Sequence, residues 1–268
     1  MSIPICITTD FTDDGGLLEP KLALFAEAGF THIHWCEHWS RDFLYEDFYT
    51  DGVRRLLTKH GLAFLDTHNA ETLAASPSAE DENARKHGVR LLENRIRFTA
   101  ALDGDAVVVH PPGKSATPEQ NRLRWENLER SFGEASKLCE ETGVRIALEN
   151  LTYGVAEDFH ALLSKLNTRW LGFCYDSGHA NVSKQPELIE RYGPRLAALH
   201  LHDNQGEKDE HALPGRGTVD WPRIMKALKN ARYPKVVNFE LMLRDQGSER
   251  DFVQDAFVKC SGVLALGS

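Results

Sequence analysis

Short apolar runs alternate along the chain with longer segments in which apolar residues recur at helical spacing. The short runs have the length and the β-branched content of strands. The eight predicted strands are Ile3–Thr9, His32–Cys36, Ala63–His68, Ala106–His110, Arg145–Glu149, Leu171–Asp176, Leu196–His202 and Val236–Leu241. The eight predicted helices are Leu17–Ala28, Asp47–Lys59, Ala79–Ala101, Pro118–Thr142, Glu157–Leu166, Pro186–Tyr192, Trp221–Lys229 and Glu249–Leu264. This order predicts an α/β fold with a parallel sheet.

A closed (β/α)8 TIM barrel accounts for this pattern as one domain over residues 1–268. The length is close to the size of about 250 residues that is typical of such barrels. Runs such as AVVV and RIAL are apolar at successive positions, as in parallel strands that are covered on both faces. A doubly wound open sheet is the alternative, but its glycine-rich phosphate-binding turn does not occur in the sequence.

Composition narrows the class of protein. The chain has 26% charged and 41% hydrophobic residues, as soluble globular proteins do, and a formal net charge of −9. The acidic balance argues against binding to nucleic acid through bulk charge. The apolar runs are too short to cross a bilayer, and the first residues do not resemble a signal peptide. Five widely spaced cysteines without a CxxC motif indicate buried, reduced thiols, so we expect a cytoplasmic protein.

Six predicted strands end in an imidazole or a carboxylate side chain. In chain order these residues are His68, His110, Glu149, Asp176 followed by His179, His200 with His202, and Glu240. The carboxyl ends of barrel strands meet at one mouth, where active sites lie. Charged groups at the ends of buried strands are costly unless they are paired or bind a metal ion. Imidazole and carboxylate are ligands of divalent cations, so the pattern predicts a metal site. The spacing alone does not choose between His200 and His202, because residues two apart on a strand share a face.

The other histidines are interpreted as helix-end or surface residues. They are His32, His34, His38, His60, His87 and His160. His60 precedes a glycine at a predicted helix end, where a partial negative charge favours it. Either His32 or His34 is also able to fill space in the second strand.

The strand ends resemble those of the xylose isomerase-like barrel superfamily over essentially the whole chain. This superfamily contains sugar and sugar-phosphate isomerases and epimerases, keto-inositol dehydratases and type IV apurinic endonucleases. The motifs that carry the resemblance are ALEN with Glu149, CYDSGH with Asp176, LHLHDN with His200, DEHALPGRGTVDW from Asp209 to Trp221, and NFEL with Glu240.

The resemblance implies a divalent metal ion, such as Mn²⁺, Mg²⁺, Co²⁺ or Zn²⁺. It places Glu149, Asp176, His200 and Glu240 as the ligands. His202 would then contact a ligand or the substrate. It also implies that Glu149 and Glu240 act as acid and base on opposite faces of a sugar. The implied reaction is isomerisation or epimerisation by proton transfer next to a carbonyl, through an enediolate, with dehydration as a third outcome.

The same resemblance leaves a hydrolytic alternative open. Type IV endonucleases use three zinc ions, and the chain offers the extra ligands that such a site needs. These residues are His68, His110, His179, Asp209 and His211. However, the long loops are acidic or neutral, which argues against DNA binding. We therefore expect a small sugar substrate, and the resemblance also implies that the chain forms a homo-oligomer.

Pocket walls are expected from residues near the ends of the first two strands. These residues are Phe11, Trp35, Glu37, His38 and Trp39. Aromatic faces suit the C–H faces of sugars. Arg216 is a candidate contact for a phosphate or carboxylate group, because phosphate sites in this fold often follow the seventh and eighth strands.

Overall fold

The computed structural model describes residues 4–12, 17–72, 75–244 and 247–267, and within them eight parallel strands form one sheet. The strands are β1 (Ile5–Thr8), β2 (His32–Trp35), β3 (Ala63–His68), β4 (Ala106–Val109), β5 (Arg145–Glu149), β6 (Leu171–Asp176), β7 (Leu196–His200) and β8 (Val237–Phe239). Their spatial order is β7-β6-β5-β4-β3-β2-β1-β8. Leu201 closes the ring, since its N–H donates to Asn238 O at 3.2 Å and its carbonyl accepts from Glu240 N at 3.1 Å. The TIM barrel prediction is confirmed.

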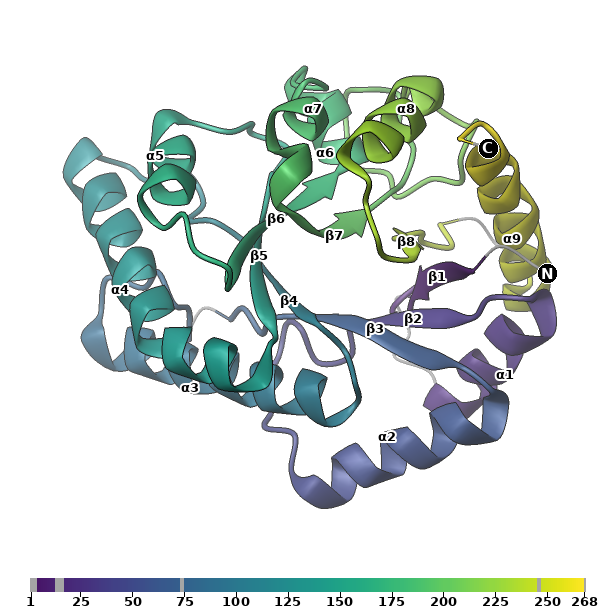
Figure 1. Cartoon of the computed structure of the whole chain (residues 1–268), viewed down its shortest axis with the longest axis horizontal. Coiled ribbons are helices and arrows are strands. Elements are labelled where there is room, and N and C mark those ends of the chain that lie inside the picture. Colours follow the sequence, from purple (N-terminus) through teal and green to yellow (C-terminus); the bar gives the residue numbers. More distant parts are fainter. Residues whose placement is uncertain (1–3, 13–16, 73–74, 245–246, 268) are drawn as a thin grey trace.

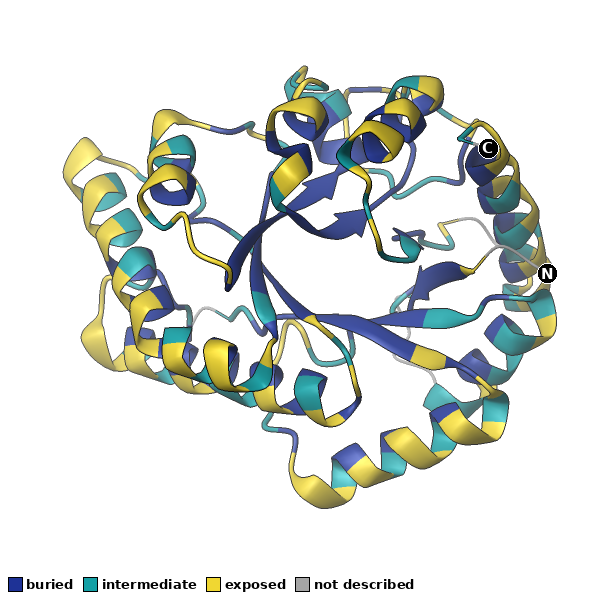
Figure 2. Cartoon of the chain, in the orientation of Figure 1, coloured by how far each residue is buried: buried dark blue, intermediate teal, exposed yellow. Residues whose placement is uncertain are grey.

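Helices surround the strands on the outside of the barrel (Figure 1). They are α1 (Leu18–Ala28), α2 (Asp47–His60), α3 (Glu82–Ala101), α4 (Pro118–Thr142), α5 (Glu157–Lys165), α6 (Ser177–Ser183), α7 (Leu188–Tyr192), α8 (Trp221–Ala231) and α9 (Glu249–Ala265). Their outward faces are exposed, whereas the strands are almost entirely buried (Figure 2). Local sequence sets the helix starts, since Thr117 accepts from Gln120 N before the proline that opens α4.

The strand period of two decides which side chains point into the barrel. On β4, Val107 and Val109 belong to the core between strands and helices, whereas Ala106 and Val108 belong to a separate inner cluster. Ala147 belongs to the same inner cluster, two residues before the glutamate that ends β5. The strand ends therefore direct their polar side chains inward, above a layer of small apolar residues.

The sequence placed several strand ends too far along the chain. β4, β7 and β8 stop at Val109, His200 and Phe239, and the residues that follow them belong to the mouth of the barrel. Ile3, the predicted start of the first strand, lies outside the described residues. The sequence also missed α6, which starts where Asp176 accepts from His179 N at 2.6 Å.

Two further expectations concern the cysteines and membranes. The five cysteines are all buried and free of disulfides, as predicted. Of the helices in the described ranges, none is long and apolar enough to cross a membrane.

Candidate metal centre at the mouth of the barrel

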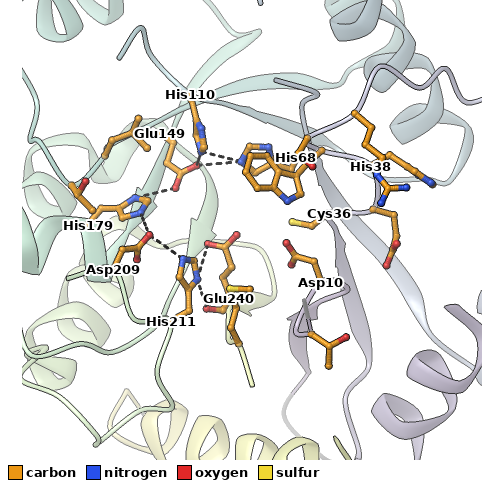
Figure 3. Close-up of a pocket in the computed structure, with 18 of the residues that line it drawn as sticks. Asp10, Cys36, His38, His68, His110, Glu149, His179, Asp209, His211 and Glu240 are labelled. Atoms are coloured by element: carbon orange, nitrogen blue, oxygen red, sulfur yellow. Dashed lines mark hydrogen bonds and ion pairs between the residues drawn. The ribbon is translucent and has the colours of Figure 1, made fainter. Parts of the chain in front are cut away.

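A cavity of about 710 Å³ opens at the carboxyl ends of the strands (Figure 3). Seven of the residues singled out from the strand ends and the loop after β7 line it. They are His68, His110, Glu149, His179, Asp209, His211 and Glu240. The structure thus brings together residues that are up to about 170 positions apart in the chain.

The four ligands implied by the resemblance form one buried group. Glu149, Asp176, His200 and Glu240 each offer one atom within 4.8 Å of the others. His200 Nδ1 lies 3.2 Å from Glu149 Oε1 and 3.2 Å from Glu240 Oε2. The first three side chains are at most 1% exposed, and Glu240 is 8% exposed. This central group has the composition and the spacing of a divalent-cation site.

A second group shares Glu149 with the central group. His68 Nε2 lies 3.1 Å from His110 Nε2, and Glu149 Oε2 lies 3.4 Å from the latter atom. On the far side of each ring, His68 Nδ1 donates to Asn69 O at 2.9 Å and His110 Nδ1 donates to Glu71 Oε2 at 3.0 Å. These outer hydrogen bonds turn both Nε2 atoms toward the shared carboxylate, so Nε2 is the atom with which each ring would bind a cation.

The third group lies on the other side of the central group. Asp209 Oδ2 is 3.1 Å from His179 Nε2 and 3.2 Å from His211 Nε2. His202 joins this group and also reaches the central one, because its Nε2 lies 3.1 Å from Asp176 Oδ1. As in the second group, the far nitrogens are bound, since His179 Nδ1 donates to Asn150 O at 2.9 Å and His211 Nδ1 donates to the Glu240 carbonyl at 3.2 Å.

The donor set fits a divalent cation on two observations. Glu149 Oε2 and Asp176 Oδ2 are buried oxygens that accept no hydrogen bond from the described residues. Buried charges of this kind are costly unless they are paired or coordinate a metal ion. Imidazole nitrogens of His68, His110 and His179 also lie 3.4–3.8 Å from these two oxygens, and the same rings in their neutral form would be metal ligands.

The electrostatics show how strongly the groups interact. Burial raises the pKa of Glu149, but His200 and the neighbouring histidines outweigh it and hold that pKa well below its usual range. Burial lowers the pKa of His200, but Glu240 and Glu149 outweigh it and raise that pKa well above the usual value. In the metal-free protein the carboxylates are therefore stabilised by protonated imidazoles. Cation binding replaces these protons, so it releases protons to solution.

The loop between β7 and α8 is held in place by a buried aspartate. Asp203 Oδ2 accepts from Gly215 N at 2.8 Å and from Trp221 Nε1 at 3.2 Å. Gly217 is required here because a Cβ would lie 2.1 Å from Asn204 O and 2.3 Å from Asp203 Oδ1. These contacts explain the PGRG stretch, since they fix the loop that carries two members of the third group.

The expected pocket walls need correction. Glu37, His38 and Trp39 line the cavity, and the Trp39 ring centroid lies 5.6 Å from that of His68. Trp35 does not line the cavity. It follows the inward-facing His34 on β2, so its side chain points outward, where its Nε1 donates to Tyr45 OH at 2.8 Å. Phe11 is likewise fully buried in the outer core, edge-on to Phe25 at 5.3 Å.

Arg216 also lies elsewhere than expected. It borders a neighbouring hollow of about 410 Å³, and its guanidinium is 3.6 Å from Asp255 of α9. The two hollows share Asp209, Met242 and Arg244 along their common edge. The glycine-rich loop turns Arg216 away from the main cavity.

Sequence reasoning missed several residues at the site. Asp10, Lys21 and Cys36 line the cavity on the side opposite the third group. Inside the barrel, His34 is 0% exposed rather than on the surface, and its Nδ1 lies 2.7 Å from Asp66 Oδ1. The strand period of two could have revealed Asp66, because it stands two residues before His68 on β3 and so shares the inward face.

Comparison with known proteins gives the family. The model of the xylose isomerase-like TIM barrel family matches residues 22–256. The chain belongs to this family. An uncharacterised relative, protein y4fM of Sinorhizobium fredii, is 35% identical in an alignment of 272 positions that covers 91% of this chain and 87% of the relative.

Two solved structures of this barrel type superpose on nearly the whole chain. A D-psicose 3-epimerase in the presence of D-fructose is 16% identical, with a TM-score of 0.77, over 99% of this chain and 100% of its own. The IolI protein with a bound zinc atom is 18% identical, with a TM-score of 0.78, over 98% of both chains. At these identities the similarity shows a shared fold.

Proposed function

We propose that this protein is a divalent-metal-dependent isomerase or epimerase that acts on a sugar, a sugar phosphate or a related keto-polyol. The observation that carries the proposal is the central group, in which two glutamates from different strands flank one imidazole nitrogen at 3.2 Å each. Family membership supports it, as do the two solved structures, of which one is a D-psicose 3-epimerase and the other holds a zinc atom.

Glu149, Asp176, His200 and Glu240 are the residues that would hold the cation. When bound, a divalent cation polarises a substrate carbonyl and lowers the energy of negative charge on its oxygen. One glutamate takes the proton from the carbon next to the carbonyl, which leaves an enediolate. The other glutamate returns a proton from the opposite face, which inverts that carbon.

The side chains around the central group shape the rest of the reaction. Trp39 covers the His68 side of the cavity with an aromatic face, and Glu37 and Lys21 present polar groups, 3.7 Å apart, to a substrate hydroxyl. Return of the proton to the neighbouring carbon gives aldose–ketose isomerisation instead. Loss of a β-hydroxyl from the same intermediate gives the dehydration that keto-inositol dehydratases perform.

The test is exchange of substrate protons with deuterated water in the presence of Mn²⁺, Mg²⁺, Co²⁺ or Zn²⁺. The wild-type protein should wash deuterium into a ketose, and Glu240→Gln should lower the rate by about 10²–10⁴-fold, the usual contribution of a general acid or base. Glu190→Gln is the matched control, because that glutamate is exposed on α7, where it pairs with Arg223. If ketoses and cyclic ketones bind but never exchange, the proposal is wrong.

A zinc phosphodiesterase acting on abasic DNA is the second candidate. The observation that favours it is that the second and third groups flank the central group, and that Glu149 belongs to both the second and the central group. Three zinc ions in the purified protein, together with nicking of an abasic duplex, would establish this function. One ion per chain and deuterium exchange would establish the sugar reaction instead.

A further inference from the structure

His200 differs from the other histidines of the metal centre in its far nitrogen. In His68, His110, His179 and His211 the nitrogen that faces away from the centre donates to a carbonyl or carboxylate oxygen at 2.9–3.2 Å. His200 turns Nδ1 toward Glu149 and Glu240, so Nε2 is its far nitrogen. That Nε2 is buried and has no hydrogen-bond partner among the described residues. A buried N–H group without an acceptor is rare and costly, so this nitrogen requires an acceptor nearby.

The neighbouring ring of His34 has a nitrogen that is able to accept this hydrogen bond. His34 lies inside the barrel, and its ring centroid is 4.6 Å from that of His200, with the two planes at 64°. Its Nδ1 is bound to Asp66 Oδ1 at 2.7 Å, which fixes the proton on Nδ1. In the neutral ring Nε2 then carries the lone pair, and this atom also has no partner among the described residues.

We propose that His34 is a positioning residue that accepts the Nε2–H hydrogen bond of His200, directly after a small ring rotation or through one water. This bond holds the His200 proton on Nε2 and leaves the Nδ1 lone pair free for the cation. The inference rests on the proposed function, because it assumes that a cation binds the central group. It adds a chain of acceptors that runs from the carboxylate of Asp66 through two imidazoles to the metal centre.

The lower end of this chain is anchored at the bottom of the barrel. Lys235 Nζ lies 3.5 Å from Asp66 Oδ2 and 2.5 Å from Asp105 Oδ1. The ammonium group of Lys235 stabilises the negative charge of Asp66, whose Oδ1 accepts from His34 Nδ1 at 2.7 Å. Asp66 thus stays a carboxylate and keeps the His34 proton on Nδ1.

The test measures Co²⁺ binding to the metal-free protein by titration calorimetry and by the visible absorption of the bound ion. His34→Phe keeps the ring volume and removes the acceptor, so its Kd should rise by about 10–100-fold, as is usual when such outer partners are lost. His34→Gln offers an amide oxygen near the position of Nε2, so it should recover most of the affinity. His32→Phe is the matched control on the same strand, since His32 bonds to Thr31 Oγ1 at 2.8 Å instead.

The thermal unfolding temperature of each metal-free variant separates misfolding from loss of the acceptor. A folded His34→Phe with the wild-type Kd and absorption spectrum overturns the inference while leaving the proposed function intact. Equal weakening in the folded Phe and Gln variants also overturns it, because the acceptor would then not matter. A wild-type protein that binds no Co²⁺ overturns the inference and the metal-dependent function together.

Discussion

The replacement Asp203→Asn tests whether one carboxylate holds the loop that carries Asp209 and His211. Asp203 is 0% exposed and accepts hydrogen bonds with both oxygens. Oδ1 accepts from Val219 N at 3.1 Å, and Oδ2 accepts from Gly215 N at 2.8 Å and from Trp221 Nε1 at 3.2 Å. Asparagine has the same shape, but one of the two oxygens becomes an NH₂ group.

Whichever way the amide turns, its NH₂ meets N–H donors that need an acceptor. Turned toward Gly215 and Trp221, it loses two hydrogen bonds to a charged group. Each such bond contributes about 1.5–3 kcal/mol, so the replacement should lower the free energy of unfolding by about 3–6 kcal/mol. This loss is a large part of the total stability of an ordinary domain, which is about 5–15 kcal/mol.

Urea unfolding gives the loss of stability, and hydrogen exchange shows whether residues 205–219 become less protected. Asp220→Asn is the matched control, because Asp220 accepts from Arg223 N as the N-cap of α8, and asparagine caps equally well. A loss below about 1 kcal/mol for Asp203→Asn, less than a single such bond contributes, with unchanged exchange in the loop, would refute the reasoning.

Four further predictions concern stability. Gly133→Ala on α4 should raise the free energy of unfolding by about 0.5–1 kcal/mol, because its Cβ meets nothing within 4 Å. Gly88→Ala on α3 should lower the free energy of unfolding by about 1–3 kcal/mol, because its Cβ would lie 2.3 Å from a backbone carbon. Urea unfolding measures the change for both glycine variants, and equal shifts would contradict the packing argument. In the metal-free protein burial lowers the pKa of His110, but Glu149 and Glu71 outweigh it and raise that pKa to about 10. Its stabilising effect is therefore complete below about pH 6.5 and is lost as the pH rises through about 10, so the unfolding temperature of His110→Gln should vary less over this range; parallel curves would contradict it. Chelation of the bound cation should lower the unfolding temperature, and return of the metal at about 100 times its Kd should restore about 2.7 kcal/mol; an unchanged temperature would argue against a bound ion.

The architecture was predictable because each step is local. Strand-length apolar runs, helical spacing and caps such as Thr117 are properties of short segments, and the alternation of runs and helical spacing repeats eight times. Parallel strands of a barrel also end at one mouth, so the polar residues after them were predictable as a cluster. The sharing of Glu149 between the central group and the second group depended on distances that residue spacing along the chain does not contain.

The errors came from side-chain direction and loop path. Trp35 was assigned to the pocket because it stands near the end of β2, yet a shift of one position on a strand reverses the face. Arg216 was assigned to the substrate, yet the turn at Gly215 and Gly217 directs it toward Asp255. For His34 the sequence left a surface position and a space-filling position in the strand both open, because spacing along one strand does not show what lies across the barrel.

The amino-acid sequence by itself determined that this chain forms eight strand–helix units and that imidazoles and carboxylates follow the strands. These features depend on neighbours in the chain, which the sequence states directly. Only the tertiary structure decided which atoms meet, such as His34 beside His200 and Asp66 above Lys235. The physical reason is that barrel closure sets the register across strands, and this register places side chains from distant segments within hydrogen-bonding or ligand distance of one another.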